Sequence, residues 1–281
     1  MNGVIVRLYK IVTANDSTTF YSSMKVDLLL LLSLAFAATA AKQNENFNLR
    51  ITNGYPAYEG KAPYIVSLLI RTDNSNIIAI GGGTIIGNTW VLTAAHCLTT
   101  DYVDIHYGSV WRGNGLYYHR VRKDNFIRHQ LWPDTNGNDI GLIRTPHVDF
   151  TSRVNKVNLP SFSQRNELFE NWWAVTCGWG GQANGKLADW LQCVDLQIMG
   201  NNECERSYGS LPNGVLCVRT PDGKSTCGGD SGGPLVTHNN PVLVGVTSFG
   251  STEGCMLGKP AGFTRVTAHL DWIRDHSGIA Y

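Results

Sequence analysis

The chain has 281 residues, of which 43% are hydrophobic and 16% are charged, and its formal net charge is +1 at pH 7. This composition excludes an intrinsically disordered chain, because such chains lack the apolar residues that form a core. The charges are mixed in sign and form no basic block, which argues against nucleic-acid or membrane partners.

The first 40 residues predict an N-terminal extension followed by a signal peptide. Lys25 precedes an apolar run that starts at Leu28 and ends in the small residues Ala38-Thr39-Ala40, the pattern of a secretory signal with its cleavage site. The apolar core is shorter than the roughly 20 residues of a membrane span, so an N-terminal anchor is the weaker alternative. We therefore expect a secreted protein.

The limits of the mature protein follow from the neighbouring segments. Met24 is the preferred translation start, which makes residues 1–23 an upstream extension, and Met1 is the alternative start. Residues 41–50 are mostly polar and predict a short propeptide. We expect one mature domain over residues 51–281.

Most of this domain shows the pattern of short β-strands. Only the C-terminal end predicts a helix, because Val266, Leu270 and Ile273 recur at helical spacing. Strands at short, regular spacing favour barrels or a sandwich, with a split near residues 155–160. The apolar or β-branched runs bounded by turn residues are 64–70, 77–80, 90–93, 103–107, 140–143, 174–176, 191–198, 214–218, 234–237 and 242–247.

Three segments contain the residue types of a serine-based hydrolytic site, namely residues 92–97, 138–142 and 228–234. A lone His, Asp or Ser would more often be structural, but the three segments together behind a signal peptide favour chemistry. In this order they resemble the chymotrypsin family of serine proteases, and the similarity extends from Ile51 to about His276. Residues 173–180 and 191–198 are similar to the Jonah group of insect midgut digestive proteases.

The resemblance implies an all-β fold of two antiparallel six-stranded β-barrels with a C-terminal helix. The active site would lie in the cleft between the barrels. Ser231 would be the nucleophile, and His96 would accept its proton and later protonate the leaving amine. Asp139 would orient the imidazole, and the backbone N–H groups of Gly229 and Ser231 would stabilise the oxyanion.

The resemblance also implies activation by cleavage. Arg50-Ile51 matches the activation junction of the family, and an activating protease would free the ammonium group of Ile51. This group would pair with the Asp230 carboxylate, since a buried carboxylate without a partner is strongly unfavourable. The alternative is that Arg50 belongs to an ordinary linker.

The expected specificity pocket favours apolar substrates. Ser225 matches the floor of the pocket, where an Asp would select Arg or Lys, and Gly250 and Ala261 match its walls. The methyl group of Ala261 would narrow the pocket, which leaves aromatic, Leu or smaller side chains open. Ser248-Phe249-Gly250 would pair with the substrate main chain. Glu253 near the rim would favour substrate side chains with some basic character.

The seven cysteines behind a secretory signal predict a disulfide framework with at least one unpaired thiol. Cys97 departs from the family pattern, because its usual partner position holds Gly81. We expect a buried free thiol, with an intermolecular link as the alternative. The pairs that the resemblance implies are Cys177–Cys193, Cys204–Cys217 and Cys227–Cys255.

These features predict an active digestive endopeptidase of the gut lumen that acts through an acyl-enzyme. We expect no cofactor and no metal site, because the other histidines lack ligand spacing. The expected partners are polypeptide substrates, an activating protease and protein inhibitors. We expect the protein to be a monomer. A catalytically silent homologue that acts as a binding or regulatory protein is the main alternative, although such homologues usually lose a catalytic residue. A regulatory protease of a cascade is a third possibility.

Overall fold

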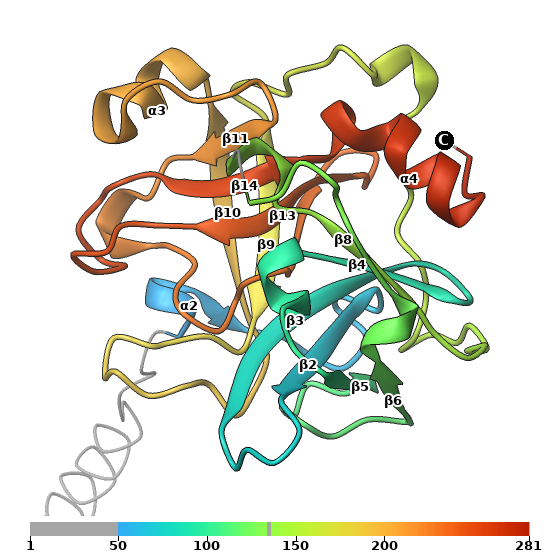
Figure 1. Cartoon of the computed structure of the whole chain (residues 1–281). Coiled ribbons are helices and arrows are strands. Elements are labelled where there is room, and N and C mark those ends of the chain that lie inside the picture. Colours follow the sequence, from blue (N-terminus) through green and yellow to red (C-terminus); the bar gives the residue numbers. More distant parts are fainter. Residues whose placement is uncertain (1–49, 134–135, 281) are drawn as a thin grey trace, which may run out of the picture. The chain divides into compact units, whose positions relative to one another are not determined.

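The computed structural model describes residues 50–133 and 136–280 (Figure 1). The expected signal peptide and most of the expected propeptide lie outside the described residues. No helix of the described part is long and apolar enough to cross a membrane. The fold therefore concerns the segment that begins at Arg50 and ends at Ala280.

The first half of the described chain forms one antiparallel sheet with the order β6-β5-β2-β3-β4-β8-β7. The two edge strands follow each other along the chain, joined by the three-residue turn η2 (Lys123–Asn125), so the sheet closes into a barrel. Strands β3 and β4 also follow each other along the chain and pair antiparallel. The strands are β2 (Ile65–Arg71), β3 (Ile78–Gly87), β4 (Trp90–Thr93), β5 (Tyr102–Tyr107), β6 (Tyr117–Arg122), β7 (Phe126–Arg128) and β8 (Gly141–Arg144).

The second half forms an antiparallel sheet with the order β1-β10-β11-β14-β13-β12-β9, and β9 pairs back onto β10. Six of these strands therefore close a second barrel, and the two-residue strand β1 adds to its outside. The all-β fold of two barrels is confirmed. The strands are β1 (Tyr55–Pro56), β9 (Trp173–Gly178), β10 (Gln192–Met199), β11 (Val215–Val218), β12 (Pro234–Thr237), β13 (Leu243–Phe249) and β14 (Ala261–Arg265).

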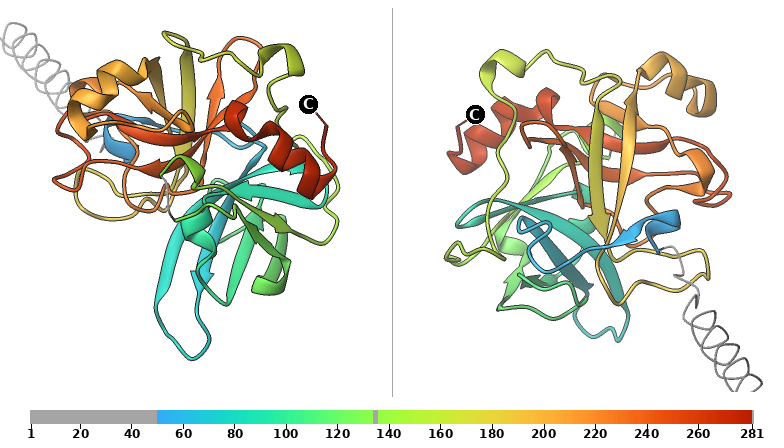
Figure 2. Two further views of the ribbon diagram at one scale, coloured as in Figure 1. Left: turned by 45° about the horizontal axis from the view of Figure 1, so that its top comes forward. Right: turned by 180° about the vertical axis from the view of Figure 1, so that it is seen from behind.

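The helices are few and short (Figure 2). The expected C-terminal helix is confirmed as α4 (Leu270–Ser277), which follows the 3₁₀ turn η6 (Val266–His269). Helix α3 (Asn201–Tyr208) was not predicted, because only Cys204 of its residues is buried and no apolar stripe marks it. The four-residue α2 (Arg50–Asn53) is a bent turn rather than a regular helix, since Ile51 has a φ of 44°.

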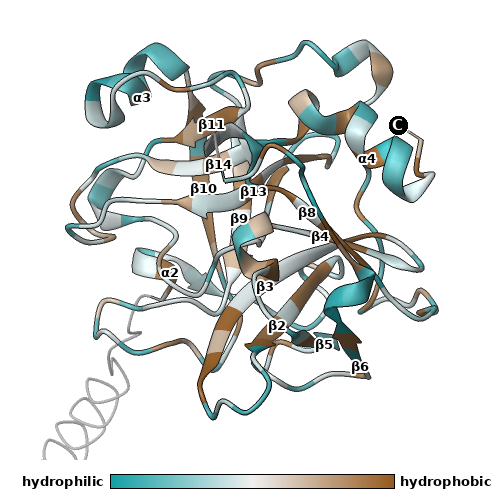
Figure 3. Cartoon of the chain, viewed as in Figure 1, coloured by the Kyte–Doolittle hydropathy of each residue, from teal (hydrophilic) through white to brown (hydrophobic). Residues whose placement is uncertain are grey.

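Each barrel has its own apolar core, and a third cluster joins the two. This shared cluster combines Leu92 and Leu142 of the first barrel with Val236 and Val246 of the second, and α4 covers it through Ile273. Figure 3 shows hydrophobic residues gathered on the strands, whereas α3 is largely hydrophilic. Because β4, β8, β12 and β13 meet at this cluster, the loops at their ends are held close together.

Candidate active site

His96 and Asp139 are brought together by two paired strands. His96 lies in the 3₁₀ turn η1 (Ala95–Leu98), just after β4, and Asp139 lies two residues before β8. Since Thr93 of β4 is the partner of Gly141 in β8, the two loops must touch. The Asp139 carboxylate accepts a hydrogen bond from the His96 backbone N–H at 2.9 Å, and its second oxygen lies 2.7 Å from His96 Nδ1.

Asp139 is 5% exposed, and its carboxylate is well supplied with donors. Ser248 Oγ donates to it at 2.6 Å, and Thr264 Oγ1 donates to the Asp139 backbone oxygen at 2.7 Å. Burial opposes ionisation, but the hydrogen bonds and the charge of His96 outweigh it, so the pKa of Asp139 lies below its usual value. Ser248 therefore contacts the Asp139 carboxylate, a contact that the sequence did not indicate.

The same pair acts on the imidazole. Burial would lower the pKa of His96, but the hydrogen bond to Asp139, the neighbouring Cys97 and the charge of Asp139 together outweigh it. The pKa of His96 therefore lies above its usual value. One ring nitrogen faces Asp139, which leaves Nε2 as the nitrogen able to exchange a proton with a substrate or a nucleophile.

Ser231 lies on a tight loop that the first barrel helps to fix. Gly229 and Gly232 adopt φ values of 99° and 80°, which residues with a side chain rarely adopt. Gly82 of β3 donates its N–H to the Ser231 carbonyl at 2.8 Å. Ser231 and His96 line one cavity of about 480 Å³, although no hydrogen bond joins their side chains within the described structure. Such pairs often align only when substrate binds.

Two backbone N–H groups of this loop are free to bind an anion. Asp230 N–H donates to the Cys227 carbonyl, and Gly232 N–H donates to the Thr247 carbonyl. By contrast, the N–H groups of Gly229 and Ser231 meet no acceptor among the described residues. These are the two donors expected to stabilise an oxyanion, and their freedom fits that task.

Asp230 is 1% exposed and holds its carboxylate inside the second barrel. It accepts backbone N–H groups from Gly180 and Cys227, each at 2.8 Å. Burial raises the pKa of Asp230 to about 6, and no cation pairs with it among the described residues. A Cβ at Gly178 or Gly180 would collide with the carboxylate, so glycine is required at both positions.

The activation segment enters the same region. Ile51 is fully buried in the core of the second barrel. Thr52 Oγ1 donates to the Ser225 carbonyl at 3.1 Å, and Ser225 N–H donates to the Thr52 carbonyl at 3.2 Å. The second residue after the expected cleavage point is thus joined directly to the expected floor of the specificity pocket.

A cavity of about 190 Å³ lies beside Ser231. Ser225, Ser248, Phe249 and Gly250 line it, so the structure brings these expected pocket residues together. Ala261 does not line this cavity, because its side chain is buried within β14. A wider groove of about 860 Å³ continues past the same edge, lined by residues that the sequence had not singled out, among them Trp132, Tyr208, Leu211 and Lys259.

The three disulfides join the pairs that the resemblance implies, namely Cys177–Cys193, Cys204–Cys217 and Cys227–Cys255. Cys97 is the free thiol and is buried. Its Sγ lies 3.7 Å from the Ser231 carbonyl oxygen. A Cβ at Gly81 would lie 3.4 Å from the same sulfur, which identifies the place of the missing partner.

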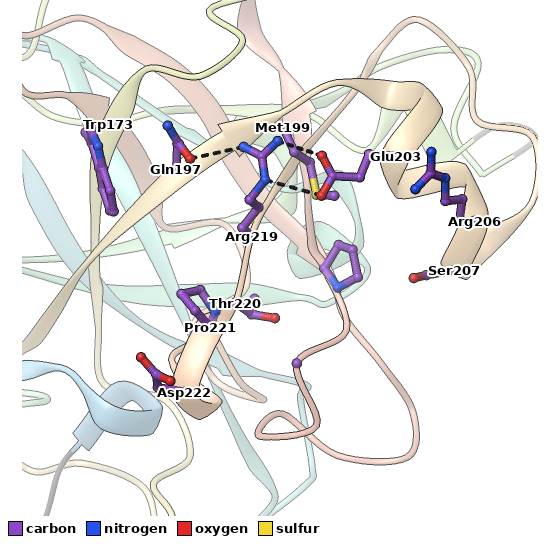
Figure 4. A pocket seen from close by; sticks show the side chains of 12 residues that line it. Trp173, Gln197, Met199, Glu203, Arg206, Ser207, Arg219, Thr220, Pro221 and Asp222 are labelled. Atoms are coloured by element: carbon purple, nitrogen blue, oxygen red, sulfur yellow. Dashed lines mark hydrogen bonds and ion pairs between the residues drawn. The ribbon is translucent and has the colours of Figure 1, made fainter.

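A separate pocket of about 480 Å³ lies between β10, α3 and the loop after β11 (Figure 4). Arg219 occupies it and is held by both carboxylate oxygens of Glu203 and by Gln197. Trp173 and Pro221 form apolar walls. Ser207 and two carboxylates are among the described residues that line it, but no histidine is, so this pocket is not a second site of the same kind.

Two antiparallel β-barrels with a serine, a histidine and a buried aspartate at their junction define a chymotrypsin-like serine protease. The chain matches the Trypsin family over residues 51–273. It is 57% identical over 235 residues to Serine protease 1 of Drosophila melanogaster, covering 83% of this chain and 87% of the relative. The chain therefore belongs to the trypsin family of serine proteases.

Two further comparisons agree with this assignment. The chain is 40% identical over 264 residues to Collagenase of Hypoderma lineatum, covering 90% of this chain and 99% of the relative. The solved structure of HL collagenase aligns with a TM-score of 0.76 at 40% identity and covers 82% of this chain and all (100%) of that chain. The similarity thus spans nearly the whole described domain.

Proposed function

We propose that this chain is a secreted serine endopeptidase that cleaves polypeptides through an acyl-enzyme. The observation that carries the proposal is the arrangement around Ser231: the His96–Asp139 pair borders its cavity, and the N–H groups of Gly229 and Ser231 are free. Ser231 Oγ attacks the carbonyl carbon while His96 Nε2 takes its proton. His96 then protonates the leaving amine, and water repeats the sequence in reverse to release the acid.

The proposed preference is for apolar side chains at the residue whose carbonyl is attacked. Ser225 supplies a neutral hydroxyl where a basic side chain would need a carboxylate, and Phe249 offers an apolar edge. We propose a digestive role of the Jonah type in the gut lumen, supported by the 57% identity to an insect serine protease. A relative named Collagenase makes structural proteins reasonable substrates to include in a test.

We also propose that the protein is made as a precursor, with residues 1–40 and 41–50 removed before the domain 51–281 acts. Cleavage after Arg50 by another protease would give Ile51 an ammonium group. The buried Asp230, with two backbone donors and a raised pKa, is the acceptor that this ammonium would satisfy. Protein inhibitors that fill the groove would be further partners of the monomer.

The proposal is tested by labelling the active site. The secreted precursor is cleaved after Arg50 and treated with a phosphonylating reagent directed at serine, and peptide mapping locates the adduct. We expect stoichiometric labelling of Ser231 and parallel loss of peptidase activity, with no labelling of Ser231→Ala. A folded, cleaved protein that takes up no label and cleaves no peptide would instead be the silent homologue.

A further inference from the structure

The cavity beside Ser231 has one charged residue in its wall. Of the described residues that line it, Lys259 is the one acidic or basic residue. Lys259 also lines the wider groove, so this residue borders both spaces. A substrate side chain that enters the cavity therefore meets Lys259 in its wall.

Glu253 balances this charge from the groove side. It lines the groove but not the cavity, and its Oε1 lies 2.6 Å from Lys259 Nζ. The carboxylate side chain is 65% exposed, whereas that of Lys259 is 38% exposed. The Lys259 side chain is therefore the less exposed of the two partners.

The backbone at Lys259 is held firmly. Its carbonyl accepts a hydrogen bond from Thr220 Oγ1 at 2.8 Å, and the next carbonyl, of Pro260, accepts one from the Tyr208 hydroxyl. The preceding Gly258 adopts a φ of 72°. Because the main chain is fixed on both sides, only the side-chain torsions and the contact with Glu253 decide where the ammonium lies.

We propose that Lys259 determines the charge selectivity of the cavity and that Glu253 regulates the strength of this effect. This inference rests on the proposed protease function and refines its substrate class. The ammonium repels arginine and lysine side chains, so Ser225 is not the sole reason for an apolar preference. The ion pair with Glu253 weakens the field of the ammonium, so the wall repels basic side chains and attracts acidic ones less strongly than an unpaired Lys259 would.

The two partners therefore have opposite predicted effects when they are substituted. Lys259→Met removes the repulsion and leaves the Glu253 carboxylate unpaired beside the entrance, so basic side chains gain. Glu253→Gln leaves the ammonium unpaired, so acidic side chains gain. Each gain is expected to be about tenfold relative to phenylalanine, since a charge pair at partly screened distance contributes on this scale.

The experiment measures kcat/KM of the activated full domain on three peptides that differ only in Phe, Arg or Glu at the cleaved residue. The Arg:Phe ratio should rise in Lys259→Met, and the Glu:Phe ratio should rise in Glu253→Gln. Lys123→Met is the matched control, because it breaks an exposed ion pair with Asp101 away from both spaces. Rates are normalised to titrated active sites, so differences in folded fraction cancel.

A reversed pair keeps the test open if a single variant folds poorly. Lys259→Glu combined with Glu253→Lys retains an ion pair and places a carboxylate in the cavity wall, so the Arg:Phe ratio should rise. If the parent is active but the ratios are unchanged in all three variants, the role of Lys259 is overturned and the protease proposal stands. A parent that neither cleaves the peptides nor labels at Ser231 would overturn the protease proposal together with this inference.

Discussion

At the residue scale, two buried carboxylates have opposite surroundings. Asp139 accepts side-chain and backbone hydrogen bonds and faces an imidazole, and its pKa is lowered. Asp230 accepts only two backbone N–H groups, and burial raises its pKa to about 6. The first environment is ready to stabilise a cation that forms during a reaction, whereas no cation lies beside the second in the part of the chain that the structure describes. Different experiments therefore test the two residues.

Asp139→Asn should move the pH profile as well as slow the reaction. The carboxylate raises the pKa of His96, and a protonated His96 cannot act as a base, so the acid limb of kcat/KM should shift to lower pH in the variant. The rate should fall on the order of 10⁴-fold, as expected when a base loses its orienting partner. Ser248→Ala is the control, because it removes one hydrogen bond but keeps the charge. An acid limb that stays in place would contradict the assigned role.

Ser225→Asp should redirect the cavity toward basic side chains. Ser225 is 3% exposed and lines the cavity, so a carboxylate there would be poorly solvated and would seek a cation. We expect the Arg:Phe ratio of kcat/KM to rise about tenfold or more, which is 1.4 kcal/mol of transition-state stabilisation. Ser225→Ala should leave the ratio low. Equal ratios in both variants would show that Ser225 is not the floor.

At the element scale, the site depends on a few links between the ends of strands. The Gly82 N–H of β3 holds the Ser231 carbonyl, and the free Cys97 thiol follows β4 next to the same carbonyl. The two segments lie close enough for a covalent link, yet Gly81 supplies no sulfur. The histidine loop is therefore held by packing and hydrogen bonds alone.

Gly81→Cys should form the missing disulfide with Cys97 and stabilise the first barrel. The Cβ position lies 3.4 Å from the sulfur, and closing a loop of this length contributes about 3 kcal/mol to the free energy of unfolding. Denaturant unfolding and thiol titration measure the two effects, and the thiol count should fall from one to none. Gly81→Ser adds similar bulk without a bond and should show no gain. A stable variant that retains two thiols would contradict the predicted geometry.

At the scale of the whole molecule, the second barrel contains a fully buried Ile51, an Asp230 with no cationic partner among the described residues, and Ser225, the proposed pocket floor, which is hydrogen-bonded to Thr52. Cleavage before Ile51 would alter all three at once, because the new ammonium group adds the missing charge. The first barrel supplies His96 and Asp139. Among the described residues, no ion pair joins it to Ile51, Asp230 or Ser225. The proposed activation would therefore act within the second barrel.

Arg50→Gln should leave a folded but inert precursor. Treatment with trypsin-like activating enzymes should yield peptidase activity only from the parent, because the variant cannot release the Ile51 ammonium. Activity on a short ester substrate and N-terminal sequencing measure the result. Full activity of the variant without cleavage elsewhere would refute the activation scheme.

Cleavage should also stabilise the fold in a pH-dependent way. In the precursor, the raised pKa of Asp230 makes its contribution unfavourable as pH rises from about 4 through about 6. In the cleaved protein an ammonium partner lowers that pKa, so the contribution becomes favourable over the same range. The Tm difference between cleaved parent and Arg50→Gln should therefore be larger near pH 7 than near pH 4. A constant difference would show that Asp230 does not receive the new terminus.

The sequence predicted the strands of high apolar content, the C-terminal helix and the residues of the site. It missed β6, whose polar and apolar residues are mixed, and it missed most of β3, because glycines at 81–83 are uncommon in strands. It also missed α3, which buries only Cys204. These elements depend on partners distant in the chain, and local composition does not reveal them.

The sequence by itself determined which side chains are available for chemistry. The motifs around Ser231, His96 and Asp139 indicate the candidate catalytic groups, and the odd number of cysteines indicates an unpaired thiol. Only the tertiary structure decided which groups meet. In the structure Ser248 donates to Asp139, and the N–H groups of Gly229 and Ser231 meet no acceptor among the described residues. Lys259 lines the cavity, whereas Ala261 does not. The physical reason is that these contacts join loops from separate strands, and their distances are set by the packing of two barrels around a shared apolar cluster.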